Sequence, residues 1–328
     1  MNRLRPAYLN GMDPSNLPPG QHVLSWVLHE ASVPIGKVPA DQPIAALSMP
    51  PIGPGPVREA WLTTEPVIHG RMGAIRHASA GPWLMGVGCW PAEDIAGATR
   101  QAHRDIIGLI GDRQAGRLVR VWNYFPDINR IQDGLERYRR FCLGRHDAFL
   151  ESGLTLTEDL PAASAVGARD GGLWILFLAG RGHITQVENP RQVSAFCYPP
   201  EYGPRSPSFS RAVRFSAPGE DSLFISGTAS ILGHRTVHPD DPVAQCRTTV
   251  DNLQALLTRA GAGRLDEIGR RAVWKVYLRH PDDYAAVSQY LREVINPGSP
   301  ILFVKGDICR ADLLLEIEGF VKLGDNEP

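Results

Sequence analysis

Side chains able to do chemistry stand together in the segment ICRADLLLEIEGF, residues 308–320. If its second half is a strand, alternation puts Glu316 and Glu318 on one face and apolar side chains on the other. We expect the apolar face to be core and the carboxylate face to be wetter. Among leucines, desolvation favours the neutral form of a carboxyl group, which can donate a proton. The competing interpretation of Glu316 is an exposed glutamate that pairs with Lys305 or Lys322.

A thiol, Cys309, lies shortly before Glu316 in the same segment. We expect it on the neighbouring strand of one hairpin, where both side chains could border a single cleft. A free cysteine is more often a small buried apolar residue. His146 and His234 could also serve acid–base chemistry, but lone histidines more often lie on the surface or fill hydrogen-bonded positions. We therefore leave both histidines out of the predicted site.

The elements that must hold these residues occur twice along the chain. Amphipathic helices are expected over 92–110 and 243–257, where apolar residues recur every three or four positions. Each is followed by a glycine-containing break, a strand and a second amphipathic helix, and each half closes with a proline and two strands. The pattern predicts a duplicated β-β-α-β-α-β-β unit. We place an N-terminal extension with strands and Pro/Gly-rich loops at 1–79, a degenerate first repeat at 80–187, a junction loop at 188–211 and a second repeat at 212–328.

Composition argues against several classes of function. The 328 residues carry 34 Lys and Arg against 35 Asp and Glu, so the basic excess that nucleic-acid binding relies on is missing. No apolar run approaches the roughly 18 residues of a spanning helix, and the start MNRLRPAYLNG lacks an apolar signal core. We expect a cytoplasmic protein without nucleic-acid or membrane partners. Five cysteines without a CxxC pair favour neither disulfides nor a metal site.

Several motifs resemble those of known families. In the second half, SLFISGTASI, VAQCRTTVDNLQALLTRAGAGRLDEI, VYLRHPDDYAAVS and LLEIEGF resemble the successive motifs of the YjgF/Rid enamine deaminases. Together with VRVWNYFPDIN, GLERYRRFCLGRHDAF, LPAASAVG, YGPRSPSFSRA and FISGTASILGH, they resemble the chorismatases, which build on the Rid fold. The resemblance implies an α+β fold of two tandem YjgF/Rid-like (chorismate-mutase-like) units, each a mixed sheet with two helices on one face. Because single-unit relatives assemble as trimers, it leaves a monomer and a trimer open.

The chorismatase resemblance implies an enzyme that releases pyruvate from the small molecule chorismate without a cofactor. Protonating the vinyl ether of chorismate needs one acid with a raised pKa, and the resemblance assigns this role to Glu316. Cys309, with Gly227 in the SGTAS strand, resembles the type that forms 3-hydroxybenzoate, with 4-hydroxybenzoate as a second product of some members. A small residue at 227 would leave room for the substrate's own 4-hydroxyl to attack. Gly227 could equally mark a strand bulge or a close backbone approach.

The two carboxylates of chorismate call for planar, two-donor arginines. Arg205 and Arg211 in YGPRSPSFSRA are the first candidates, because a proline-braced loop can fix their aim. Tyr202 in the same loop could add a phenolic donor. Tyr138 and Arg145 are further candidates from the first half. The competing interpretation of each loop arginine is a solvated surface residue.

Other functions stay open at this point. They are a chorismate hydrolase giving a dihydroxycyclohexadienoate and pyruvate, a Rid-like enamine or imine deaminase, and a ligand-binding protein. The deaminases carry a working arginine at a position that is Leu302 here, which counts against that activity. A binding protein would not require Glu316. In the first repeat the matching position is Phe177, give or take one residue, so only the second repeat carries the acid.

Overall fold

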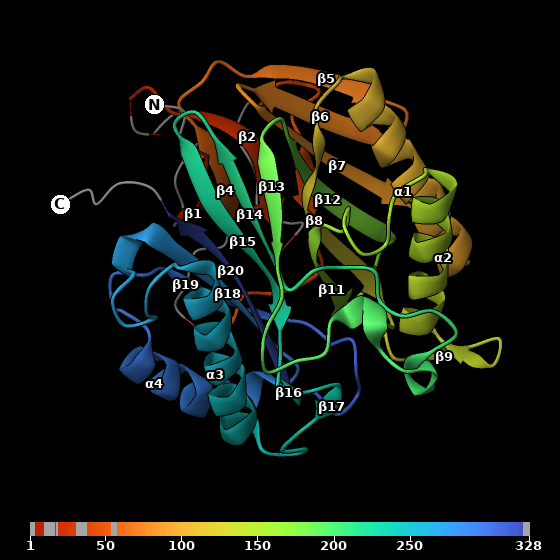
Figure 1. Cartoon of the computed structure of the whole chain (residues 1–328). Helices are drawn as coiled ribbons and strands as arrows, with labels where there is room; N and C mark the ends of the chain where they lie inside the picture. Colours follow the sequence, from red (N-terminus) through yellow and green to blue (C-terminus); the bar gives the residue numbers. More distant parts are fainter. Residues whose placement is uncertain (1–3, 10–16, 18, 31–37, 54–57, 324–328) are drawn as a thin grey trace.

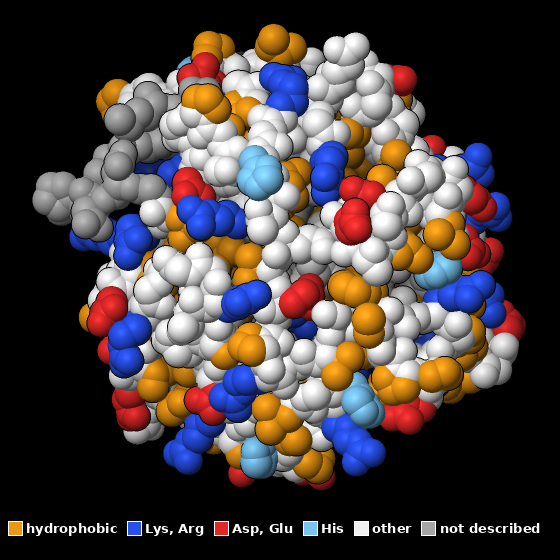
Figure 2. All heavy atoms as spheres, in the orientation of Figure 1, with side chains coloured by type: hydrophobic (Ala, Val, Ile, Leu, Met, Phe, Trp, Pro, Cys, Tyr) orange, Lys and Arg blue, Asp and Glu red, His pale blue; other side chains and the backbone are white. Residues whose placement is uncertain are grey.

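Three β-sheets surround a shared core in the computed structural model, which describes residues 4–9, 17, 19–30, 38–53 and 58–323 (Figure 1). Parts of the predicted extension 1–79 and the end of the predicted repeat 212–328 lie outside the described residues. In the part of the chain that is described, no helix is both long and apolar enough to cross a membrane. On the face drawn in Figure 2, basic and acidic side chains are interspersed, in keeping with the net charge of −1.

The first large sheet has the strand order β11-β8-β12-β7-β6-β5. Its strands are β5 (Ile68–Met72), β6 (Ile75–Ala80), β7 (Trp83–Trp90), β8 (Arg117–Pro126), β11 (Ala162–Ala168) and β12 (Leu173–Gly180). Helices α1 (Ile95–Asp112) and α2 (Arg137–Glu151) cover one face of this sheet (Figure 1). The helical face predicted over 92–110 is confirmed, because Ile95, Ala102 and Ile106 on α1 are buried.

The second large sheet has the strand order β13-β14-β15-β20-β18-β19. Its strands are β13 (His183–Val187), β14 (Ala212–Ala217), β15 (Glu220–Thr228), β18 (Ala272–Leu278), β19 (Ile301–Lys305) and β20 (Leu315–Lys322). Helices α3 (Pro242–Ala260) and α4 (Tyr284–Val294) pack against it. Local chemistry sets the limits of α3. The Asp241 side chain accepts a hydrogen bond from the Ala244 amide, Pro242 fits the first turn, and Gly261 ends the helix with φ 67°.

The two large sheets repeat each other strand for strand. Read in reverse, the second order is β19-β18-β20-β15-β14-β13, and both sheets place one parallel pair, β11/β8 and β19/β18, at the same end. The expected fold of two tandem units, each a mixed sheet with two helices, is therefore confirmed. Matching Pro126 with Pro281 puts Leu176, opposite Trp122, at the place of Glu316, opposite Tyr277. The structural counterpart of Glu316 is apolar and lies one residue from the predicted Phe177.

The limits of the sheets differ from the predicted repeat limits of 80 and 187. Strands β5 and β6 already belong to the first sheet, so it begins at Ile68, and β13, which ends at Val187, belongs to the second. Of these three strands, β5 and β13 lie at sheet edges and have the sequences IHGRM and HITQV, whose polar residues weaken the alternation that identifies a half-buried strand. The further division of the chain into domains stays a prediction.

The predicted hairpin before Glu316 is wrong. Strand β18 lies between β19 and β20, parallel to the first and antiparallel to the second. The connection from β19 to β20 therefore crosses β18, and Cys309 lies in this connection and not on a strand. The earlier strand β18 lies between β19 and β20 and keeps them apart, which a reading of adjacent strands as hairpin partners does not anticipate.

A third sheet, formed by the N-terminal part of the chain, packs against both large sheets. It has the order β1-β4-β2-β3, with β1 (Arg5–Leu9), β2 (His22–Leu28), β3 (Ile44–Ala46) and β4 (Arg58–Thr63). The Trp61 ring of β4 lies 5.2 Å from the Trp122 ring of the first large sheet and 6.3 Å from the Phe224 ring of the second. The shared core thus contains aromatic side chains from all three sheets.

Short elements complete the fold. Two small hairpins are β9 (Ile131–Gln132) with β10 (Leu135–Glu136), and β16 (Ile231–Leu232) with β17 (Arg235–Thr236). Single turns of 3₁₀ helix lie at Ala195–Cys197, Pro200–Tyr202, Gly269–Arg271 and Pro281–Asp283. The first two of these turns belong to the junction between the large sheets, which borders the pocket described next.

Candidate active site

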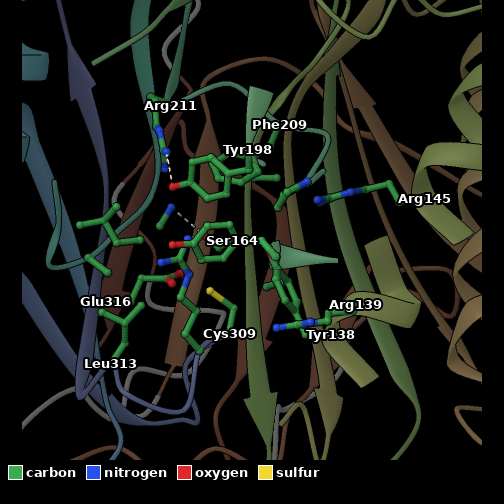
Figure 3. A pocket seen from close by; sticks show the side chains of 18 of the residues that line it. Tyr138, Arg139, Arg145, Ser164, Tyr198, Phe209, Arg211, Cys309, Leu313 and Glu316 are labelled. Carbon is green, nitrogen blue, oxygen red and sulfur yellow. Dashed lines mark hydrogen bonds between the residues drawn. The ribbon is translucent and has the colours of Figure 1, made fainter. Parts of the chain in front are cut away.

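A pocket lies where the two large sheets meet. Edge strand β11 of the first sheet runs beside β15 of the second: the Ala163 amide donates to Ser226 Oγ at 2.8 Å, and the Gly227 amide donates to Ser164 Oγ at 2.9 Å. The pocket beside this contact encloses about 760 Å³, including its open mouth. In Figure 3, Glu316 and Leu313 lie on one side of it, Tyr138, Arg139 and Arg145 on the other, and Cys309 between them.

Glu316 is a buried acid facing this pocket. Its side chain comes from β20 and the residue is 4% exposed. Within the described part of the chain, its Oε1 atom has no hydrogen-bond partner. Burial, and after it the nearby Glu318 charge, raises the pKa of Glu316 to about 8, although Arg120 and Arg211 oppose the rise. The carboxyl group is therefore largely protonated at neutral pH.

One expectation for the strand of Glu316 and the competing interpretation of Glu316 are wrong. The carboxylate face of its strand is not wetter than the apolar face, because Glu316 and Glu318 are both buried at the contact between the sheets. No ion pair joins Glu316 to Lys305 or Lys322 among the described residues, and Lys322 instead pairs with Glu220. A two-fold alternation of side chains cannot tell a solvent face from a face that a second unit covers.

Gly227 makes room for the Glu316 carboxyl group. A Cβ atom at position 227 would lie 1.8 Å from Glu316 Oε1, far inside contact distance. The register of β15 against β20 shifts between Ile225 and Thr228, which is the signature of a bulge. The predicted bulge is thus present at Gly227, and the close neighbour is the side chain of the acid itself instead of the backbone of another strand.

Cys309 lines the pocket as a neutral thiol. Burial, and after it the Glu316 charge, raises the pKa of Cys309 to about 12. A thiol with such a pKa is not a thiolate nucleophile at neutral pH. Cys309 also packs against the apolar cores on either side of the pocket, so it is a partly buried apolar residue as well as a pocket residue.

Of the predicted binding residues, all but one line the pocket. Arg211 is buried, and its Nη2 atom donates to Tyr198 OH at 2.7 Å and to the Val193 carbonyl at 2.9 Å. Arg145 of α2 is buried with its guanidinium 4.9 Å from the centre of the Phe141 ring. Tyr138 and Tyr202 also reach the pocket. Arg205 is exposed and is not among the lining residues, so its competing interpretation as a solvated loop arginine holds.

Sequence reasoning missed Arg310 and Tyr198. The Arg310 guanidinium lies 4.2 Å from the Tyr202 ring centre and 5.2 Å from that of Tyr198, and its Nη1 donates to the His234 carbonyl at 2.9 Å. Stacking of this kind fixes the plane of a guanidinium group. The position of Arg310 directly after Cys309 was an available signal. Tyr198 gave none beyond its place in the junction loop.

Glu318 does not share the environment of Glu316. Arg120 Nη2 lies 2.7 Å from its Oε2 atom, and Trp122 Nε1 donates to its Oε1 atom at 3.0 Å. Lys275 Nζ lies 3.3 Å from the same Oε1 atom and 2.6 Å from Glu59 of the N-terminal sheet. Both carboxylate oxygens of Glu318 are thus engaged by partners, whereas Oε1 of Glu316 has none among the described residues. Glu316 is the better candidate acid of the two.

Together these residues could protonate an electron-rich atom of a small anionic molecule. Glu316 supplies a proton from a desolvated carboxyl group, and Arg145, Arg211 and Arg310 supply positive charge around the same cavity. Apolar side chains and the neutral thiol would limit the access of water to a bound molecule.

Comparisons with known proteins agree with one another. A family model described as "Chorismatase FkbO/Hyg5-like, N-terminal" matches residues 59–179. A 3-hydroxybenzoate synthase of Streptomyces hygroscopicus is 35% identical, covering 98% of this chain and 98% of that protein. A chorismatase of Streptomyces rapamycinicus is 38% identical, covering 80% and 81%. A crystal structure of a chorismatase matches with a TM-score of 0.83 at 33% identity, covering 98% of each chain.

Proposed function

The chain belongs to the chorismatase family, and on that premise we propose that it converts chorismate to 3-hydroxybenzoate and pyruvate with Glu316 as the proton donor. The observation that carries the proposal is the buried, protonated carboxyl group of Glu316 beside Gly227 and Cys309. One relative similar over nearly the whole chain is named a 3-hydroxybenzoate synthase. We expect a cytoplasmic enzyme that is either a monomer or a trimer.

The first step is protonation of the vinyl ether. Glu316 gives its proton to the methylene carbon of the enolpyruvyl group, which becomes an oxocarbenium ion and prepares pyruvate to leave. A carboxyl group with a pKa near 8 is populated in the donating form at neutral pH, and it regains a proton readily after the reaction. Glu316 is thus suited both to donate a proton and to take one up again.

The second step is attack from within the substrate. The 4-hydroxyl oxygen bonds to C3 while the C3–O bond to the pyruvyl group breaks, and its proton is released. The resulting arene oxide opens at C4 as its oxygen atom takes up a proton, and loss of the C3 hydrogen as a proton restores the aromatic ring. No water is consumed and no net oxidation occurs, because chorismate has the atoms of 3-hydroxybenzoate plus pyruvate. The protein's part is therefore to donate and retrieve a proton and to exclude water.

The substrate carboxylates need cations placed on the pocket wall. We assign Arg211 and Arg145 to them, with Tyr202 and Tyr138 as phenolic donors, and we add Arg310. A buried arginine loses little further freedom on binding a carboxylate, and its planar fork fits the two oxygens. The exposed Arg205 has no part in this assignment.

Incubation of the purified protein with chorismate tests the proposal. A coupled assay measures pyruvate, and chromatography identifies the ring product. We expect pyruvate and 3-hydroxybenzoate in equal amounts, apart from any 4-hydroxybenzoate. A dihydroxycyclohexadienoate as the main product would show that water attacks instead, and would make the protein a chorismate hydrolase. The absence of pyruvate would contradict both activities. The enamine-deaminase alternative has no support in the pocket, because Leu302 is buried in the core on β19.

Product choice gives a sharper test at Cys309. Protonation by Glu316 precedes the branch between internal attack and attack by water. Replacement Cys309→Ala should therefore lower the yield of 3-hydroxybenzoate more than it lowers pyruvate release. The ratio of aromatic product to pyruvate, measured in one reaction mixture, checks this. An equal fall in both would mean that Cys309 acts before the branch.

A further inference from the structure

The mechanism leaves one buried carboxylate beside the site without a role. Glu318 follows Glu316 by two positions on the same strand face, and it is 4% exposed. It does not line the pocket that holds Glu316. Its partners are Arg120 of β8, Lys275 of β18 and Trp122, so it is tied to both large sheets.

Ser164 connects Glu318 to the pocket wall. Its Oγ atom lies 2.6 Å from Arg120 Nη2, 2.9 Å from the Gly227 amide nitrogen and 2.7 Å from Glu318 Oε2. The guanidinium group of Arg120 and the backbone N–H of Gly227 can only donate hydrogen bonds, so the one hydroxyl proton of Ser164 must point to Glu318. The hydroxyl group therefore accepts twice and donates once, and it has no hydrogen-bonding capacity left for a substrate.

The contacts that begin at Glu318 and pass through Ser164 reach Glu316 by way of Gly227. The Gly227 amide that Ser164 holds belongs to the residue whose Cα faces Glu316 Oε1. Any movement of this bulge would change the space in which the Glu316 carboxyl group sits. Glu318 thus acts on Glu316 by two routes, one through Ser164 and Gly227 and one directly through its charge.

We propose that Glu318 is a positioning residue for the acid: through Ser164 it fixes Gly227 against the Glu316 carboxyl group. The inference rests on the proposed role of Glu316. It also gives a role to a buried charge cluster formed by Glu59, Arg120, Lys275 and Glu318. None of these four is among the described residues that line the pocket, but Arg120 and Glu318 both contact the lining residue Ser164.

The charges around Glu316 fix the sign of the effect. Glu318 favours the protonated form, whereas Arg120 and Arg211 favour the ionised form. The other titratable or charged groups on the pocket wall are Glu136, Tyr138, Arg139, Arg145, Tyr198, Tyr202, Cys309 and Arg310. Replacing Glu318 by glutamine removes a charge that raises the Glu316 pKa and leaves Arg120 and Lys275 less compensated. Both changes should lower that pKa.

The test is the pH dependence of kcat/KM for chorismate in Glu318→Gln. Activity should be lost on the alkaline side as Glu316 ionises, and this loss should move to lower pH by about one unit in the variant. The variant should keep KM nearly unchanged, because Glu318 does not reach the substrate. If the variant is active and its kcat/KM falls at the same alkaline pH as that of the wild type, the inference is overturned.

Glu220→Gln is the matched control. Glu220 is another buried glutamate of the second large sheet, paired with Lys322 and with the Leu4 amide, and it does not line the pocket. Its replacement should lower stability without moving the alkaline loss of activity. An equal displacement in both variants would also overturn the inference, because it would reflect general loosening of the sheet.

Two further measurements cover the remaining outcomes. If Glu318→Gln does not fold, Ser164→Ala cuts the link to Gly227 while both charges remain, and kcat should fall about 10-fold with little change in KM. An unchanged kcat would reject the link. Infrared difference titration of the carboxyl band that Glu316→Gln abolishes needs no substrate, and this band should titrate at lower pH in Glu318→Gln. If the wild type releases no pyruvate but the band is still displaced in Glu318→Gln, the proposed function is refuted and the positioning role of Glu318 is not.

Discussion

Glu316 keeps its proton because its surroundings hold the charged form poorly. The carboxyl group is desolvated, one of its oxygen atoms has no partner in the described structure, and its nearest carboxylate neighbour repels a second negative charge. The two arginines that would favour ionisation have other partners, since Arg120 pairs with Glu318 and Arg211 donates to Tyr198. At the scale of a single residue, the site is therefore reactive because desolvation raises the pKa of the Glu316 carboxyl group.

Replacing the acid by its amide should remove activity and leave the fold intact. Glu316→Gln keeps the shape of the side chain but has no transferable proton, so pyruvate release should fall by about 10²–10⁴-fold. A coupled pyruvate assay measures the loss, and a circular dichroism spectrum like that of the wild type shows that the variant folds. Retention of most of the activity would assign proton donation to another group. Glu318 is unsuited to it because two cations hold its carboxylate.

The same replacement should make the stability of the protein less sensitive to pH. The folded pKa of Glu316, about 8, lies above the ordinary value of 4.5, so the wild type loses stability as pH rises from about 4.5 to 8. The loss is about 1.4 kcal/mol per pH unit over this window. The stability of Glu316→Gln relative to the wild type should therefore increase between pH 5 and pH 8. Urea unfolding at both pH values measures it, and a difference that is constant with pH would contradict the raised pKa.

At the scale of elements, the packing of α2 on α1 positions one wall of the pocket. Tyr138 and Arg145 extend from α2 into the pocket, and Gly144 is the point where α2 approaches α1. A Cβ atom at Gly144 would lie 2.1 Å from the Ala96 carbonyl oxygen, which is backbone and cannot move aside alone. The separation of the two helices, and with it the depth of the pocket, is set at this glycine.

Replacement Gly144→Ala should therefore push α2 outward. We expect a loss of about 1–3 kcal/mol in the free energy of unfolding from overpacking, and a raised KM for chorismate as Arg145 is displaced. Gly108→Ala on α1 is the control, because a Cβ atom there meets no atom of the described residues within 4 Å. It should gain about 0.5–1 kcal/mol from helix propensity. Thermal unfolding and steady-state kinetics compare the two, and a stable Gly144→Ala variant with normal KM would contradict the packing argument.

How far sequence predicts these elements depends on the range of the interactions that define them. Helices α1 and α3 can be predicted from the spacing of their own apolar residues, because each helix buries one continuous face. Cys309 was misplaced because its position depends on β18, which enters the sheet between β19 and β20 from an earlier part of the chain. The environment of Glu318 was equally inaccessible, since its partner Arg120 lies 198 positions away. The role of Glu316 could be proposed from family resemblance, but no local pattern indicated its burial between two units.

At the scale of the whole molecule, buried ion pairs join all three sheets. Lys275 of the second large sheet contacts Glu59 of the N-terminal sheet and Glu318, and Glu318 contacts Arg120 of the first large sheet. These groups lie in the shared core, where charges are expensive unless each is paired. The cluster therefore makes the docking of the three sheets depend on specific partners, beyond the contacts of their aromatic side chains.

Breaking this cluster should weaken the whole structure. Lys275→Met leaves Glu59 and Glu318 without a shared cation, and we expect a loss of about 3–5 kcal/mol in the free energy of unfolding. Arg264→Met removes an ion pair with Asp266 on the surface and should leave the unfolding midpoint nearly unchanged. Chemical denaturation of both variants gives the comparison. A Lys275→Met variant as stable as Arg264→Met would show that the buried pairs contribute nothing net.

The duplicated sheets have a consequence for how the site can change over time. In an assembly of identical subunits, symmetry copies every substitution into every interface, so no join can specialise alone. Here both halves lie in one chain, and the position that is Glu316 in one half is Leu176 in the other. One half is thus free to keep the acid while its counterpart becomes ordinary core. The presence of both units in one chain therefore permits a division of labour between structurally equivalent positions, because a mutation at one position is not copied to the other.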